Sequence, residues 1–247
     1  MARKEADEIT LNEMNDKEGT TEGALAVVRG TMELGAVQGE VDESELQLPR
    51  LQITYGVGKA SANFNQGDLI LAGESLIAKK GEPLQIIVLN ATTYWKERLT
   101  KAGYDAGLFP RSYATEKEVS DVGGITKWSK NPADPKPDFS LALNMKLFIE
   151  KPKDLVCAMF GIPVGGKDYA AAVWDVDKTA YKRVAPEIRN ASRFSLRTRG
   201  LLSGVFTMFT RSEVVGNNPT IVPVMKLTGH NNDEVIEEIK TLFGQGA

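Results

Sequence analysis

The stretch from Phe139 to Ile149 limits the possible folds most strongly. Every second residue of this stretch is apolar, and the residues between them are mainly polar. Successive side chains of a β-strand point to opposite faces of its sheet, so this alternation is typical of a strand with one face on a core. The pattern predicts a long strand in a β-rich protein.

Other segments also have strand character. The segment Leu84–Leu89 is apolar at every position except Gln85, which is typical of a central strand covered on both faces. Gly165-Gly166 separates two strand-like segments, 155–164 and 167–176, and such a glycine pair is a strong hairpin signal. Further strands are expected at 48–55, 68–71, 193–199, 201–211 and 220–227.

Two helices are expected, and one long loop. Asp177 is placed to cap a short helix that Pro186 kinks or restarts, and the residues after Asn232 repeat apolar side chains at helical spacing. Residues 94–137 are rich in glycine and proline and show little regular structure, which indicates a long functional or mobile loop. We therefore predict a mainly β protein, a five-stranded OB-like β-barrel with long insertions and a C-terminal helix.

Charge divides the chain into unequal parts. Residues 1–46 contain twelve of the 33 acidic residues and four of the 30 basic ones, a net charge of −8, so the remainder carries +5. We expect an acidic, largely disordered arm at 1–46, an OB-like domain at 47–230 and an amphipathic helix within 231–247 that packs on it. This division fits a nucleic-acid binder whose acidic segment competes for its own groove. It fits an ordinary domain with a disordered leader equally well.

Catalytic and metal-binding residues are scarce. One histidine, His230, and one cysteine, Cys157, cannot form a zinc site of the usual His/Cys type, and neither a Ser-His-Asp nor a Cys-His relay has obvious parts. No catalytic residue, metal site or cofactor is predicted. An enzyme would have to use carboxylate pairs such as Asp175 and Asp177 around Mg²⁺, although helix capping explains Asp177.

Location follows from what the sequence lacks. A single cysteine permits no internal disulfide, and the first residues contain no apolar segment of the signal-peptide type. No apolar run approaches the ~20 residues of a membrane span. We expect a cytoplasmic protein that does not bind membranes.

Aromatic residues stand beside cations at several places, a combination that suits single-stranded nucleic acid because bases stack on rings while cations contact phosphates. The alternative for each pair is a core aromatic beside a cation with a buried stem. On the strand predicted at 193–199, three arginines share one face; the alternative is a solvated edge strand. The candidate binding residues are Arg193, Arg197, Arg199, Tyr181, Lys182, Arg183, Trp95, Lys96, Arg98, Arg111, Tyr113, Lys127, Trp128 and Lys130.

The order of several segments resembles a family of tailed-phage early proteins, the single-stranded DNA-binding proteins of the replication region. The resemblance lies in Leu48-Pro49-Arg50-Leu51, in Gly67-Asp68-Leu69-Ile70-Leu71, in Pro83–Leu89 followed by Tyr94-Trp95-Lys96, and in Phe194-Ser195-Leu196. It implies an OB-type barrel that protects single strands during phage replication in the host cytoplasm. Its implied partners are single-stranded DNA, with RNA as the alternative, and replication proteins, and it leaves room for an oligomer.

A second function class remains open. A structural or regulatory phage protein, such as a virion component or a modulator of a host enzyme, would bind another protein. It would use the terminal helix or the apolar patch at 24–28 as its interface. Self-association without nucleic-acid affinity would favour this class.

Overall fold

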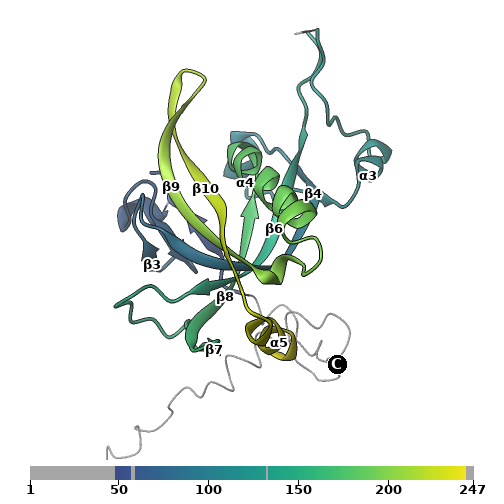
Figure 1. Ribbon diagram of the computed structural model, residues 1–247. Helices are drawn as coiled ribbons and strands as arrows, with labels where there is room; N and C mark the ends of the chain where they lie inside the picture. The colour runs from purple at the N-terminus through teal and green to yellow at the C-terminus, as the bar shows by residue number, and fades with distance from the viewer. Residues whose placement is uncertain (1–47, 57–58, 132, 243–247) are drawn as a thin grey trace, which may run out of the picture.

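The computed structural model describes residues 48–56, 59–131 and 133–242, and over this part of the chain the protein is mainly β. A seven-stranded sheet has the order β10-β9-β4-β6-β8-β7, with β5 beside β4, and a three-stranded sheet has the order β1-β2-β3 (Figure 1). All pairings between these strands are antiparallel. The strands are β1 (Leu51–Ile53), β2 (Leu69–Leu71), β3 (Ser75–Ala78), β4 (Leu84–Glu97), β5 (Ser112–Tyr113), β6 (Phe139–Glu150), β7 (Ile162–Val164), β8 (Lys167–Val176), β9 (Gly204–Val215) and β10 (Asn218–His230).

The large sheet is an open path from β10 to β7, and within the described residues no pairing joins these two strands into a closed barrel. The mainly β class is therefore confirmed. The OB-like barrel is not confirmed and stays a prediction.

Strands β4 and β6 form the centre of the large sheet. As predicted for a central strand, β4 pairs on both sides, and its Ile86 and Ile87 point to opposite faces and are both buried. The alternation along β6 predicted one buried face. In fact Ala142 and Phe148 on its second face are buried as well, because further elements cover that side of the sheet.

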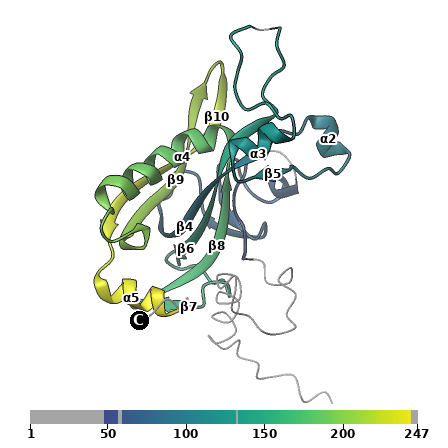
Figure 2. The same ribbon diagram turned by 90° about the vertical axis from the view of Figure 1, so that its right-hand side faces the viewer.

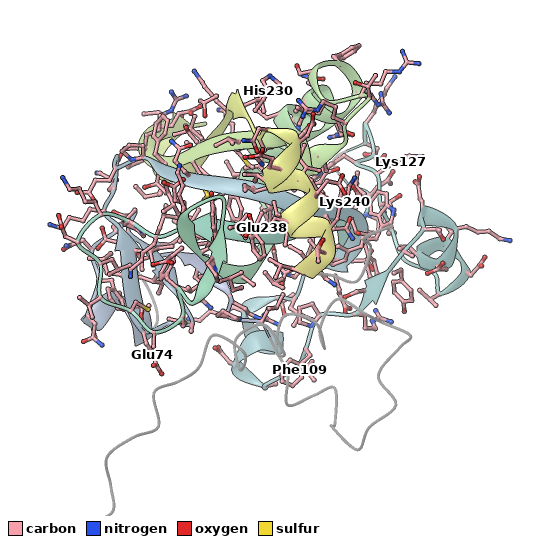
Figure 3. The ribbon with its side chains drawn as sticks, turned by 60° about the horizontal axis from the view of Figure 1, so that its bottom comes forward. Glu74, Phe109, Lys127, His230, Glu238 and Lys240 are labelled. Atoms are coloured by element: carbon pink, nitrogen blue, oxygen red, sulfur yellow. The ribbon has the colours of Figure 1, made fainter. Side chains whose placement is uncertain are left out.

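Each face of the large sheet has its own cover. On one face the small sheet and α4 (Lys178–Asn190) pack over a large apolar cluster, to which α4 contributes Val184 and Ile188 (Figures 1 and 2). On the other face α5 (Asp233–Leu242) inserts Ile239 beside Phe148 and Tyr169. In Figure 3, Glu238 and Lys240 mark α5 where it crosses the sheet. The expected C-terminal helix is thus present, and its apolar face is buried.

The β7–β8 hairpin forms as its glycine pair predicted. Gly165 and Gly166 have φ values of 56° and 76°, in the left-handed region that a two-residue hairpin turn requires and that glycine adopts without strain. The amide of Gly165 also donates a hydrogen bond of 2.8 Å to Glu238 of α5. The hairpin turn therefore helps to fix the C-terminal helix.

The region from 94 to 137 contains more regular structure than the sequence suggested. Strand β4 runs on to Glu97, and α2 (Lys101–Asp105), β5 and α3 (Glu116–Asp121) follow. Thr115 caps helix α3, because its Oγ1 accepts from the amide of Glu118 at 3.2 Å, and the Glu118 carboxylate accepts in turn from Thr115 Oγ1 at 3.0 Å and from the amide of Ala114 at 3.1 Å. The rest of the described insertion, residues 122–131 and 133–138, is turns and irregular chain.

The prediction of a strand at 193–199 is wrong. Helix α4 continues through Pro186 to Asn190, and a π-helix, η2 (Ala191–Ser195), extends it, with the amide of Leu196 bonding to the carbonyl of Ala191 at 2.8 Å. Phe194 is 77% exposed while Leu196 is 2% exposed, so the two do not form one apolar face. The period-two pattern was accidental, and the three arginines share no strand face.

Three sequence predictions fall outside the described residues: the acidic arm at 1–46, the apolar patch at 24–28 and the contribution of Phe243 to the last helix. Among the helices that the structure describes, none is long and apolar enough to cross a bilayer.

Candidate nucleic-acid interface

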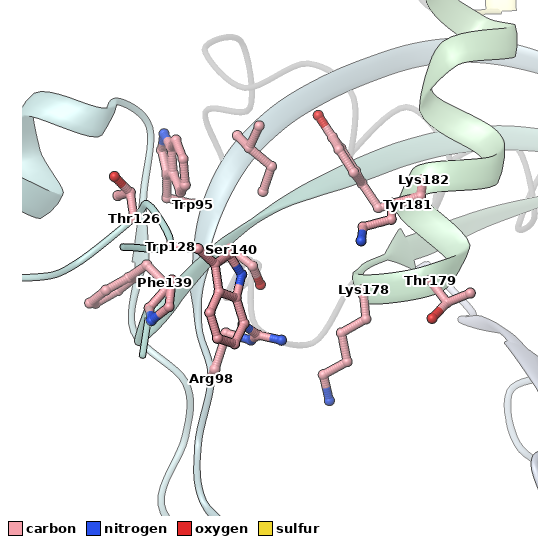
Figure 4. Close-up of a pocket in the computed structure, with 12 residues that line it drawn as sticks. Trp95, Arg98, Thr126, Trp128, Phe139, Ser140, Lys178, Thr179, Tyr181 and Lys182 are labelled. Atoms are coloured by element: carbon pink, nitrogen blue, oxygen red, sulfur yellow. The ribbon is translucent and has the colours of Figure 1, made fainter. Parts of the chain in front are cut away.

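A cleft of about 320 Å³ opens where the end of β4, the start of β6, the loop before β6 and the start of α4 meet (Figure 4). Its two walls come from segments that are far apart in sequence, the β4–β6 region on one side and α4 on the other. The lining residues are Trp95, Arg98, Thr126, Trp128, Pro137, Phe139, Ser140, Leu141, Lys178, Thr179, Tyr181 and Lys182.

The β4–β6 wall is aromatic. Antiparallel pairing places Trp95 opposite Leu141, and Phe139, at the first position of β6, is 1% exposed. Trp128 is 65% exposed, and the guanidinium of Arg98 lies 5.9 Å from its ring centre, within cation–π range. This wall thus combines the buried ring of Phe139 with the solvent-exposed ring of Trp128.

Local contacts anchor the loop that carries Trp128. The amide of Ile125 donates to the Asp138 carboxylate at 2.6 Å, and Thr126 Oγ1 donates to Glu116 of α3 at 2.8 Å. Lys127 Nζ also reaches Glu116, at 3.0 Å. The hydrogen bonds from Thr126 and Lys127 lower the pKa of the Glu116 carboxyl. The base of the loop is therefore tied to both α3 and the chain that enters β6.

The opposite wall is the first turn of α4. Asp177 is the N-cap residue, as predicted, but its side chain caps no helix amide; it binds Lys96 Nζ at 3.0 Å instead. Lys178 follows with a φ of 51°, and Tyr181 and Lys182 come one turn later. Residues four apart lie on the same side of a helix, so Lys178 and Lys182 both face the cleft.

The charge of the cleft is positive. Arg98, Lys178 and Lys182 line it, and no carboxylate appears among its lining residues. None of these three cations forms an ion pair within 4.0 Å with a residue that the structure describes. Their charges therefore remain available to an anionic ligand.

The structure brings five of the fourteen predicted site residues together in this cleft: Trp95, Arg98, Trp128, Tyr181 and Lys182. Five other predicted cations are held in ion pairs within the chain. These pairs are Lys96–Asp177 at 3.0 Å, Arg111–Glu97 at 2.8 Å, Lys127–Glu116 at 3.0 Å, Arg183–Glu213 and Arg199–Asp233.

The remaining four predicted residues do not line the cleft. Tyr113 pairs with Trp95 across β4 and β5, and its ring packs 5.5 Å from that of Phe139, so it supports the aromatic wall. Lys130, Arg193 and Arg197 are exposed elsewhere on the surface.

Sequence reasoning missed Lys178 and Phe139 as residues of the cleft. Lys178 could have been found, because it directly follows the predicted cap Asp177 and precedes Lys182 by four residues. Phe139 had been assigned to the core, where most of its surface does lie. Only the tertiary structure shows that its ring also forms part of a cleft.

The carboxylates that an enzyme would require are occupied by neighbouring side chains. Asp175 accepts hydrogen bonds from Asn144 Nδ2 at 2.7 Å and from the Tyr94 hydroxyl at 3.3 Å, while Asp177 pairs with Lys96. Burial and the charge of Asp175 raise the pKa of Tyr94. Within the described chain, no group of three or more His, Cys, Asp and Glu side chains is placed to hold a metal ion.

Comparison of the chain with protein-family models, with curated proteins and with solved structures finds no match. The chemistry and geometry of the cleft are therefore the basis on which a function is inferred.

Proposed function

We propose that the protein is a non-catalytic single-stranded DNA-binding protein and that the cleft between β4–β6 and α4 holds its bases. One observation carries the proposal: Trp128 is 65% exposed at a cleft that also presents Trp95, Tyr181 and cations without carboxylate partners. Flat rings beside cations match the bases and phosphates of a nucleic acid.

The shape of the cleft favours a single strand over a duplex. A space of about 320 Å³ admits only a few flat groups, and the bases of a duplex are already stacked on one another. Unstacked bases can instead insert beside Trp128, Trp95 and Tyr181, at about 1–3 kcal/mol per stacked base. The sequence resemblance adds phage replication in a host cytoplasm as the setting, with RNA as the alternative ligand.

The open sheet is sufficient for this role. In the proposal, β4 and β6 supply the platform and α4 supplies the cations, so the function does not depend on barrel closure. The OB-like barrel remains a prediction, implied by the sequence resemblance to the phage family.

A protein-binding function is the second candidate, and the exposed loop at Leu108 and Phe109 favours it. Phe109 is 90% exposed, at a position remote from α5 (Figure 3), and Leu108 is 58% exposed. Helix α5 is no longer a candidate interface of this kind, since its apolar face packs on the large sheet. Of the two interfaces that the sequence suggested, the apolar patch at 24–28 stays a prediction outside the described residues, and the loop is the candidate that the structure adds.

The proposal is tested by fluorescence anisotropy of a labelled oligothymidine, titrated with the full chain at several salt concentrations. Trp128→Ala should weaken binding by about 5- to 150-fold, the loss that corresponds to one stacked base. Phe109→Ala is the matched control, because it removes another exposed aromatic ring outside the cleft and should leave the affinity unchanged.

Competition with unlabelled nucleic acids shows which kind of strand the protein prefers. Unlabelled oligothymidine should displace the probe at far lower concentration than duplex DNA, and oligouridine places RNA on the same scale. Absence of binding at low salt, or equal losses in the Trp128 and Phe109 variants, would reject the cleft as the site and turn attention to a protein partner at Leu108 and Phe109.

A further inference from the structure

We infer that the phosphate backbone of the bound strand leaves the cleft along the exposed face of α4, on a stripe formed by Lys178, Lys182, Arg189 and Arg193. This inference rests on the proposed function and extends it, because it gives the strand a path and the site a length. Figure 2 shows α4 lying along the outside of the molecule, where such a path is accessible.

Helical geometry places the four cations on one side. At 3.6 residues per turn, positions 178, 182, 189 and 193 fall within a sector of about 60° around the helix axis. All four residues are exposed. Helix α4 and the π-helix η2 that follows it keep the chain helical from Lys178 to Ser195, so the stripe is continuous. Its length is about 22 Å at a rise of 1.5 Å per residue.

The charges of the stripe are not neutralised by ion pairs within the described part of the chain. None of the four forms an ion pair within 4.0 Å with a described residue. Arg189 donates to the carbonyl of Ala185 at 3.2 Å, and its guanidinium lies 5.8 Å from the ring centre of Tyr181. That contact brings the third cation next to an aromatic residue of the cleft. Glu187, the acidic residue of α4, lies roughly opposite the stripe on the helix.

The other route away from the cleft is less favourable to an anion. A groove of about 350 Å³ between α4 and β10 also begins at Lys182. Within it, Arg183 and Arg211 both pair with Glu213, and Glu187 adds a second carboxylate. The groove is lined by four cations, Lys182, Arg183, Arg211 and Lys226, but its two carboxylates offset half of that charge. The stripe offers cations alone, so it is the path that we assign.

The path predicts how binding depends on oligonucleotide length. The part of the stripe beyond the cleft, from Lys182 to Arg193, is about 16 Å long and spans about five nucleotides at the ~3.4 Å rise of a stacked strand, in addition to the bases held in the cleft. Affinity should therefore keep rising after the cleft is filled. The added affinity should depend strongly on salt, because each phosphate contact to a single strand adds about 0.7 to the salt slope.

The test combines strand length with charge removal in the full-length protein. Oligothymidines of about 4, 8, 12 and 16 nucleotides, the range of known site sizes, are titrated at several salt concentrations. The R189Q/R193Q variant should bind the longest strand about tenfold more weakly, with a salt slope lower by about 1.4, and the shortest strand within about twofold of the unmodified protein. The matched control is R183Q/R211Q, which removes the same charge from the α4–β10 groove and should change neither quantity.

The possible outcomes distinguish failure of the phosphate path along α4 from failure of the proposed DNA-binding function. Equal affinity of R189Q/R193Q and the unmodified protein for the longest strand overturns the path while leaving the cleft as a site. A larger loss in R183Q/R211Q than in R189Q/R193Q also overturns it and assigns the α4–β10 groove. If the unmodified protein binds no oligothymidine of any length, the proposed function fails and the path fails with it. Circular dichroism melting of each variant excludes loss of folding as the cause.

Discussion

At the scale of single residues, ion pairing separates cations that can meet a ligand from cations that cannot. Lys96 and Lys182 both stand beside an aromatic residue in the sequence, yet Lys96 is held by Asp177 at 3.0 Å while Lys182 has no carboxylate partner within the described chain. An exposed ion pair adds little stability, about 0–1 kcal/mol, but the carboxylate offsets the attraction that the cation would otherwise offer to a phosphate. The free cations are therefore those to test.

Lys182→Gln should reduce the salt slope of oligothymidine binding by about 0.7, because it removes one phosphate contact. The slope comes from anisotropy titrations at four or more salt concentrations. Lys151→Gln is the control: Lys151 pairs with Asp168 at 3.5 Å and follows the end of β6 opposite to the cleft. A similar decrease in both variants would show that net charge, rather than the cleft, governs binding.

At the scale of elements, the loop between α3 and β6 decides where Trp128 stands. Gly124 makes the close approach that this loop requires. A Cβ atom at Gly124 would lie 2.6 Å from the side chain of Val119 and 2.8 Å from the ring of Phe139. Both residues are buried, so neither can easily move away.

Gly124→Ala should displace the loop, lower the free energy of unfolding by about 1–3 kcal/mol through overpacking, and weaken oligothymidine binding together with it. Urea unfolding and anisotropy measure the two effects. Gly123→Ala is the instructive comparison: Gly123 has a φ of 75° but open space around its Cβ position, so the substitution strains the backbone without a clash at Phe139. Unchanged stability and binding in Gly124→Ala would mean that the loop does not pack on Phe139 as described.

The sequence of β10 explains why this strand lies at the edge of the large sheet. This strand contains Pro219 and Pro223, which lack the amide hydrogen that a central strand needs for pairing on both sides. The two prolines are four positions apart, an even number, so they share one orientation along the strand. The sequence of β10 is thus suited to a strand with a neighbour on one side only.

At the scale of the whole molecule, the face of the large sheet that α5 covers buries a tyrosine as well as aliphatic residues. Tyr169 is 5% exposed and its ring lies 5.8 Å from that of Phe148 under α5. Burial, together with the negative charge of Glu150, raises the pKa of Tyr169 to about 12. In the unfolded chain the same hydroxyl ionises near pH 10.

This difference links stability to alkaline pH. The contribution of neutral Tyr169 should be complete below about pH 10 and should decline as pH rises through about 12, because only the unfolded chain releases the proton early. Urea unfolding at about pH 9 and about pH 11 should show a smaller loss of stability for Tyr169→Phe than for the unmodified protein. Equal losses in both proteins would show that Tyr169 ionises as readily in the folded state as in the unfolded one.

Local patterns predicted those parts of the fold in which a short segment carries its own signal. The strands predicted at Leu84–Leu89 and Phe139–Ile149, the Gly165-Gly166 hairpin and the C-terminal helix all appear, although the first strand runs on to Glu97 into the region expected to be a loop. The segment at 193–199 failed for an equally physical reason. Its alternation is too short to outweigh the burial of Val184, Ile188, Ala191 and Leu196 at helical spacing, which extends α4 through this segment.

The sequence by itself determined the β-rich class, the main turns and the aromatic and basic residue types from which a site could be built, since periodicity and turn chemistry are local properties of the chain. The tertiary structure alone decided which of those residues meet. Trp95, Trp128 and Tyr181 share a cleft because β4, the loop before β6 and α4 pack together, and Arg111 and Arg199 are excluded because folding places Glu97 and Asp233 beside them. Proximity between distant segments depends on packing, and no pattern within one segment encodes it.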